Sequence, residues 1–182
     1  YLLRTDENPF IPSENGRDRG SFLDSCPMEY PGNGVGDYRE SAVSVEDSNG
    51  NSAVQFYYTG HRIFEGKKKL EGLPATFVEE EKSATLEIDL LDPVLQLQVT
   101  LSYSIFEDSD AIMRSAKLQN LSAAPLYLTK VMSLSLDLEQ KDFRLLTLHG
   151  SWARERQMDY RTIGYGRQSV SSVRGESSHQ EH

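Results

Sequence analysis

Paired carboxylates are the side chains in this sequence that could do acid–base or nucleophilic chemistry, because one member can attack or accept a proton while the other donates one. They occur as Glu79–Glu81, as Glu107 with Asp108 and Asp110, and as Asp137 with Glu139. A charge run between strands is usually solvated, and Asp favours turns because it bonds its own backbone. We therefore interpret all three groups as surface or turn residues and not as catalytic pairs.

Histidine, cysteine and serine offer no second catalytic arrangement. The four histidines are widely spaced: His61, His149, His179 and His182. Cys26 is the single thiol, so no pair has the short spacing of zinc ligands. Ser177 and Ser178 precede His179, but adjacency in sequence does not hold a hydroxyl against an imidazole ring. The sequence predicts no metal, no cofactor and no catalytic residue within this chain.

The segment from residue 149 to residue 182 is rich in arginine, although the protein as a whole has 28 acidic and 19 basic residues. Five arginines follow residue 149: Arg154, Arg156, Arg161, Arg167 and Arg174. The planar guanidinium group pairs bidentately with carboxylates, so such a row suits a contact with another domain or subunit. We predict that residues 149–182 form a docking segment. The residues expected to make its contacts are Trp152, Arg154, Arg156, Arg174, His179 and Gln180.

The elements that must position these residues are predicted to be β-strands. Residues 95–105 alternate apolar residues with Gln, Thr and Ser, which is the period of a strand and not of a helix. The same period of two recurs at 86–90, 111–120, 126–138 and 143–148. Asn49–Gly50 supplies the positive φ angles of a tight turn, so residues 42–46 and 53–64 are expected to pair as a hairpin.

The pattern predicts a single all-β domain over residues 1–182, built as an antiparallel β-sandwich. Residues 1–36 are rich in Pro, Gly, Asn and Ser and are expected to be irregular, and residues 42–148 are expected to hold the strands. The polar residues that alternate along 95–105 are uncharged, which predicts a second layer or subunit on that face.

The net charge of −9 disfavours nucleic acid as a partner, because the field repels phosphate backbones. Lys67–Lys69, the one basic cluster, lies between Glu65 and Glu71 and is predicted to be a solvated turn. No apolar run approaches the roughly eighteen residues of a membrane span, so no membrane association is expected. A lone cysteine, Cys26, fits a reducing compartment and a cytoplasmic location.

Blocks of sequence along nearly the whole chain resemble the N-terminal β-domain of bacterial α-galactosidases of glycoside hydrolase family 36. They are Tyr30-Pro31, Gly36-Asp37-Tyr38-Arg39-Glu40, Gly60-His61-Arg62-Ile63, Leu70-Glu71-Gly72-Leu73-Pro74-Ala75-Thr76, Leu101-Ser102-Tyr103 and the run from His149 through Gln180. The resemblance implies a β-supersandwich. This chain would be an internal fragment of that domain, truncated at both ends so that edge strands are missing from each.

The resemblance also implies an activity for the parent protein, which would be a retaining α-galactosidase that removes terminal α-galactose from oligosaccharides of the melibiose or raffinose type. In that family the catalytic aspartates lie in a separate (β/α)8 barrel downstream, one of them in a Lys-Trp-Asp type motif. Ser151 and Ala153 flank the single tryptophan here, Trp152, so that motif is not in this chain. The chain alone is expected to be inactive, and a homo-oligomer is implied because bacterial relatives are commonly tetramers.

In oligomeric relatives a loop of this domain reaches the active-site mouth of an adjacent subunit. Asp37 and Arg39 match the family's Gly-Asp-aromatic-Arg pattern and are the expected contacts to sugar hydroxyls. A second interpretation is that these two residues only pin the glycine-rich loop. For the whole chain, the alternative is a stand-alone carbohydrate-binding or protein-interaction sandwich, which is disfavoured because no row of aromatic residues is spaced to stack on sugars.

Overall fold

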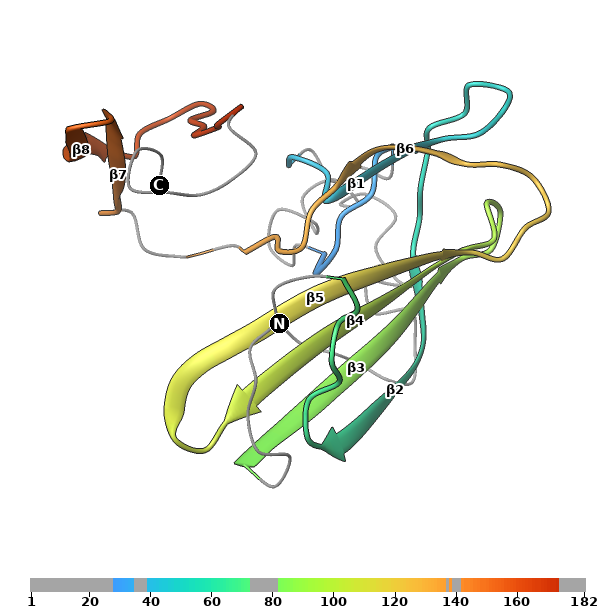
Figure 1. The fold of residues 1–182 in the computed structure, drawn as a ribbon. Helices are drawn as coiled ribbons and strands as arrows, with labels where there is room; N and C mark the ends of the chain where they lie inside the picture. Colours follow the sequence, from blue (N-terminus) through green and yellow to red (C-terminus); the bar gives the residue numbers. More distant parts are fainter. Residues whose placement is uncertain (1–27, 35–38, 73–81, 137, 139–141, 174–182) are drawn as a thin grey trace. The chain divides into compact units, whose positions relative to one another are not determined.

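The computed structural model describes residues 28–34, 39–72, 82–136, 138 and 142–173. Within these ranges the chain forms eight β-strands and no α-helix (Figure 1). The strands are β1 (Val43–Glu46), β2 (Tyr57–Glu65), β3 (Ser83–Asp92), β4 (Leu97–Phe106), β5 (Ser109–Asn120), β6 (Tyr127–Val131), β7 (Arg144–Ser151) and β8 (Arg154–Thr162). All of their pairings are antiparallel, which confirms the predicted all-β antiparallel class.

The chain divides into two compact units, Tyr1–Leu136 and Asp137–His182. The first unit contains a four-stranded sheet in the order β2-β3-β4-β5 and a two-stranded sheet of β1 and β6. The second contains the β7–β8 hairpin. A single domain over residues 1–182 stays a prediction.

The four-stranded sheet is a meander whose strands lie side by side from green to yellow in Figure 1. Alternation along β4 gives it one apolar face, because Leu97, Val99 and Leu101 are all buried. Across the sheet Leu101 lies between Ile88 of β3 and Ala116 of β5. The face predicted for residues 95–105 is therefore confirmed up to Tyr103, which is partly buried and packs against the core. Further along the same row, Ile105 is 55% exposed and lies beyond the core.

A single apolar cluster joins the two sheets of the first unit. Its buried members are Tyr30, Ala42, Val43, Val45, Val54, Phe56, Ile88, Leu95, Leu97, Val99 and Leu101. Val43 and Val45 come from β1, whereas Leu97 to Leu101 come from β4, so the two-stranded sheet covers part of one face of the four-stranded sheet. This is the two-layer arrangement that a sheet with one apolar face requires.

The hairpin predicted between residues 42–46 and 53–64 is wrong, because β1 pairs with β6 and β2 pairs with β3. The turn itself forms: Gly50 has φ 82° and its N–H donates to the carbonyl of Asp47. After the turn, however, the N–H of Val54 donates to the carbonyl of Asn33 and the N–H of Gln55 to the carboxylate of Asp92. These bonds replace a ladder with β1 and carry the chain into the other sheet.

The strand predicted over residues 126–138 is shorter than expected, because β6 ends at Val131. The N–H of Met132 makes a last backbone bond to the carbonyl of Ala42, and the carbonyl of Ser135 then accepts from the side chain of Arg114. At Ser135 the hydrogen-bond donor is therefore a buried arginine side chain and not the backbone of a neighbouring strand. The converse error occurs at β8, which falls in the segment for which only docking was predicted.

Candidate functional site

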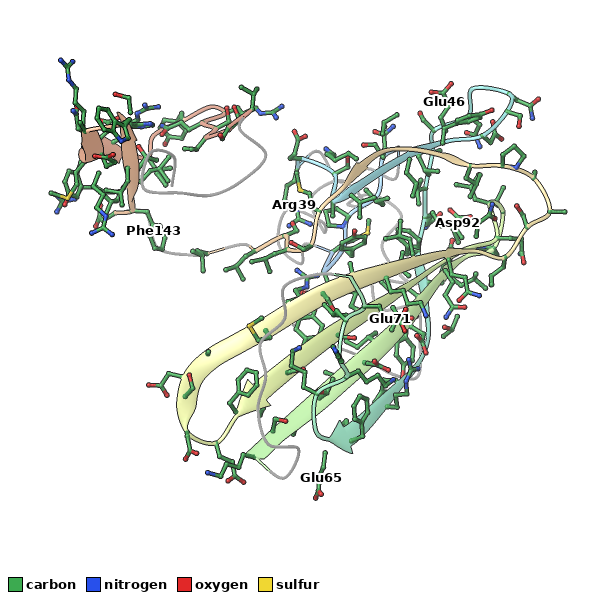
Figure 2. All side chains as sticks on the ribbon, viewed as in Figure 1. Arg39, Glu46, Glu65, Glu71, Asp92 and Phe143 are labelled. Atoms are coloured by element: carbon green, nitrogen blue, oxygen red, sulfur yellow. The ribbon has the colours of Figure 1, made fainter. Side chains whose placement is uncertain are left out.

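The segment that carries Asp37 and Arg39 is held at both ends by contacts between its two arms, residues 28–34 and 39–42, which we call the loop stem. An Nη2 hydrogen of Arg39 bonds to the carbonyl oxygen of Met28 at 2.9 Å, and the N–H of Ala42 donates to the carbonyl of Pro31 at 2.8 Å. Figure 2 labels Arg39, which lies just before β1. Asp37 lies outside the described residues, so its contact with sugar stays a prediction.

A buried arginine, Arg114, lies against this stem. It was not among the site residues predicted from the sequence. Arg114 of β5 has only 5% of its side chain exposed, and it pairs with the carboxylate of Glu29 at 3.2 Å. Its guanidinium carbon lies 5.1 Å from the ring centroid of Tyr103 and 5.9 Å from that of Tyr30. Cation–π contacts of this kind gain strength when the cation is desolvated.

The hydroxyl groups of the two tyrosines are also bound. Tyr103 donates to the Glu29 carboxylate, and Tyr30 donates to the carbonyl of Met132 at 2.8 Å. Burial raises the pKa of Tyr103, and the bond to Glu29 raises it further, while Arg114 opposes both effects. Burial likewise raises the pKa of Tyr30. Both tyrosines are therefore neutral hydrogen-bond donors at physiological pH and are unsuited to act as bases.

The opposite face of the four-stranded sheet carries a network of charges. Glu87, whose side chain is 7% exposed, accepts from Arg62 at 2.5 Å and from Lys68 at 2.8 Å. Arg62 also pairs with Asp89 at 2.5 Å, so one guanidinium bridges two carboxylates. Lys68 belongs to the cluster predicted to be a solvated turn, and its side chain is 61% exposed, as that prediction requires. Its ammonium group also pairs with Glu87 and lies over the ring of Phe64, which was not predicted.

The segment after β2 covers part of this polar face, since Thr85 donates to the carbonyl of Gly66 at 2.6 Å. Burial by itself would raise the pKa of Glu87, but the hydrogen bonds from Lys68 and Arg62 and their charges outweigh it and leave that pKa lowered. Asp89 behaves in the same way, with Thr100 and Arg62 as its donors. Two ionised, fully paired carboxylates cannot serve as a general acid, and we interpret the network as structural.

This network predicts a loss of stability in acid. A lowered carboxylate pKa in the folded chain contributes stability above the ordinary value, 4.5 for Glu87, and that contribution is lost as pH falls through the folded value. We expect the free energy of unfolding of the 182-residue chain to be flat above about pH 5 and to fall below it. Glu87→Gln should lower stability near pH 7, and in denaturant titrations the variant and the parent should converge as pH falls below the lowered pKa of Glu87.

Glu46→Gln is the matched control, because Glu46 is an exposed carboxylate at the end of β1. It should leave the difference in stability between pH 7 and pH 4 as it is in the parent chain. A Glu87→Gln chain that kept the full acid sensitivity of the parent would contradict the assignment of that sensitivity to the network.

The carboxylate groups singled out from the sequence do not form a catalytic pair where they are described. Asp108 is 74% exposed and pairs with Lys82 at 3.1 Å at the turn between β4 and β5. Asp110 is exposed at the start of β5. Glu79–Glu81, Asp137 and Glu139 lie outside the described residues. Among the residues that are described, no group of three His, Cys, Asp or Glu side chains could hold a metal ion, and no helix could cross a membrane.

The second unit presents the tip of the β7–β8 hairpin to solvent. Trp152 is 86% exposed, and Arg154 and Arg156 are exposed beside it. Gly150 is needed for this geometry, because a Cβ there would lie 2.3 Å from the carbonyl oxygen of Arg154. The structure thus brings together three of the predicted docking residues. The others, Arg174, His179 and Gln180, lie outside the described residues.

Aromatic and charged side chains continue along β8. Met158 and Tyr160 are exposed, as is Leu146 on the facing strand β7. Arg161 pairs with Asp159 at 2.7 Å within the same strand, so its charge is partly satisfied locally. A two-stranded ribbon with apolar side chains exposed is marginally stable by itself and favours a contact that covers it.

Comparisons of sequence and of structure match this chain to the same family of proteins. A family model described as the glycosyl hydrolase family 36 N-terminal domain matches residues 3–182. The alpha-galactosidase AgaA of Geobacillus stearothermophilus is 40% identical over 176 residues, which cover 96% of this chain and 24% of that protein.

Solved structures agree with that match. Two crystal structures of GH36 alpha-galactosidase AgaA variants from Geobacillus stearothermophilus, one in complex with stachyose and one with raffinose, align with TM-scores of 0.85 and 0.84. Each is 40% identical, covering 99% of this chain and 25% of the other. The chain therefore spans about a quarter of the length of these relatives.

Proposed function

Because this chain belongs to glycosyl hydrolase family 36, as its N-terminal domain, we propose that it is the non-catalytic N-terminal part of an α-galactosidase. The parent enzyme hydrolyses terminal α-galactosyl residues of oligosaccharides of the melibiose and raffinose type, and this chain serves its assembly and shapes its active site. The observation that carries the proposal is the match over residues 3–182 to the family's N-terminal domain. The relatives solved with raffinose and stachyose support the substrate class.

The experiment compares the 182-residue chain with the polypeptide that contains it, using p-nitrophenyl α-galactoside and raffinose. We expect no turnover by the chain, because the carboxylates of the charge network are paired with cations, Asp108 pairs with Lys82 at a turn, and Asp110 is exposed. The containing polypeptide should release galactose from both substrates. Turnover by the chain alone, or a containing polypeptide that is inert on every α-galactoside, would contradict the proposal.

We propose that Asp37 and Arg39 bind substrate at the active site of a neighbouring subunit. A carboxylate and a guanidinium together offer acceptors and donors for several sugar hydroxyls. Support comes from the anchored stem, which fixes the Arg39 end of the loop by its bond to Met28. The enzyme is accordingly a homo-oligomer, and the lone Cys26 supports a cytoplasmic location.

The docking segment is proposed to hold that oligomer together through the tip of the β7–β8 hairpin. Exposed Trp and Arg are the residue types enriched at binding hot spots. We expect Arg154→Ala with Arg156→Ala in the full-length enzyme to weaken assembly, seen as smaller species by light scattering at low protein concentration. The matched control is Arg144→Ala, at the other end of the hairpin. An assembly as tight as that of the control would contradict the role.

A further inference from the structure

We propose that Arg114 is a positioning residue: it fixes the loop stem and thereby sets where the substrate-binding end of the loop, at Arg39, can reach. The inference rests on the proposed function of that loop. Arg114 lies opposite Tyr103 in the pairing of β5 with β4, in the row next to the one that holds Leu101 and Ala116. It is therefore a charged residue on the face of the sheet that forms the core.

The guanidinium group bonds to two segments that lie outside the four-stranded sheet, one before β1 and one after β6. Its Nη2 donates to the carbonyl of Glu29 and pairs with the carboxylate of the same residue, each at 3.2 Å. Its Nη1 donates to the carbonyl of Ser135 at 3.2 Å. Tyr103, from the neighbouring strand, donates to the Glu29 carboxylate as well. Glu29 is thus held by two strands of the four-stranded sheet.

Glu29 is followed by the residues that fix the rest of the stem. Tyr30 bonds to the carbonyl of Met132, and the carbonyl of Asn33 accepts from Val54 at 2.9 Å. Gly32 passes so close to Val54 that a Cβ would lie 2.4 Å from its carbonyl oxygen. Pro31 is fully buried. Every residue from Glu29 to Asn33 is therefore positioned by a contact outside the stem or by close packing.

The connection to Arg39 runs through one residue. The carbonyl of Met28 accepts from Arg39, and Met28 is covalently joined to Glu29. Arg114 binds Glu29 at both its carbonyl and its carboxylate. A displacement of Glu29 therefore moves the acceptor on which Arg39 rests. When the stem is loosened, the side chains that bind substrate are displaced. Substrate binding then weakens, because it depends on the position of these groups as well as on their chemical type.

An arginine at this position fits a role in positioning the loop stem better than a role in stabilising the fold. A buried charge is costly, and an apolar residue of similar volume is often at least as stabilising. Among the described residues the Nε of Arg114 has no hydrogen-bond partner, so its directional bonds are those that the two Nη atoms make to Glu29 and Ser135. Only a planar fork reaches these groups together, and a lysine ammonium would not.

The test uses the full-length enzyme with raffinose as substrate. Arg114→Met is expected to raise KM about tenfold with a much smaller change in kcat. Arg114→Lys should retain most of that defect, because the charge is kept and the fork is lost. Leu118→Ala, on the same strand and in the same core, is the control for lost stability, and its KM should stay at the parent value at temperatures where both variants are folded.

A double-variant cycle with Asp37→Ala separates this inference from the proposed function. If Arg114 acts through the loop, Arg114→Met should have a much smaller effect on KM once Asp37 is absent. Should Asp37→Ala alone leave KM unchanged, the proposed function of the loop fails. Should Asp37→Ala raise KM while Arg114→Met behaves like Leu118→Ala, or adds independently to Asp37→Ala, the positioning role alone is overturned.

A milder variant keeps the test decisive if Arg114→Met does not fold. Tyr103→Phe removes only the hydroxyl that bonds to Glu29 and leaves the ring beside the guanidinium. It should raise KM in the same direction by about two- to threefold. An unchanged KM for both Tyr103→Phe and Arg114→Lys would overturn the inference.

Discussion

Leu101→Ala is expected to lower the free energy of unfolding of the 182-residue chain by about 2–5 kcal/mol. Leu101 is fully buried at the centre of the four-stranded sheet, between Ile88 and Ala116, and packs in the cluster that joins the two sheets. Removing most of the side chain loses its transfer free energy and leaves a cavity that paired strands on both sides cannot easily close. Denaturant unfolding followed by far-UV circular dichroism measures the change.

Ile105→Ala is the matched control, because it lies on the same strand and in the same alternating row but is 55% exposed. Its effect should stay below about 1 kcal/mol. Equal losses for the two variants would mean that the core does not lie where β1 meets β4, and the two-layer description would be wrong.

Asp37→Ala in the full-length enzyme is expected to lower kcat/KM for raffinose about ten- to a hundredfold. The estimate is the loss of one or two charge-assisted hydrogen bonds to sugar hydroxyls. Arg39→Ala should have a comparable effect, because it removes both the donor and the bond that ties Arg39 to Met28. Steady-state kinetics with light scattering on the same samples separates binding from assembly.

Asp108→Ala is the control for the loss of one carboxylate, since Asp108 is an exposed turn residue paired with Lys82. Its kcat/KM should equal that of the parent enzyme. If Asp37→Ala and Arg39→Ala behave like this control while the oligomer stays intact, the two residues only pin the loop.

The sequence predicts the strand content well because alternation is a local property. The alternation in residues 95–105 predicts one apolar face, and Leu97, Val99 and Leu101 are buried on that face in the structure. Pairing partners are a different matter. Asn49–Gly50 correctly predicts a turn, yet β1 pairs with β6, about eighty residues away, because the chain after the turn finds other backbone partners. Such partners are set by packing and cannot be read from turn chemistry.

The charged clusters were missed for the same reason. Arg114 looks like an ordinary solvated cation in the sequence, and neither Arg114 nor Lys68 has an opposite charge at a spacing that a single strand would bring together. Their partners, Glu29 and Glu87, come from distant segments. A signal existed for Arg114: it lies in an otherwise uncharged stretch from Ala111 to Ala116, where a strand with a buried face has no place for an unpaired cation.

Subunit mixing tests most directly whether this chain completes the active site of its neighbour. One full-length protomer carries Asp37→Ala with an intact catalytic barrel; the other has an intact loop and a barrel without its catalytic aspartates. Each should be poorly active alone on raffinose, and co-expressed oligomers purified through two different tags should regain activity, because an intact loop then lies beside an intact barrel. Mixed oligomers no more active than the sum of the two parents would contradict the account.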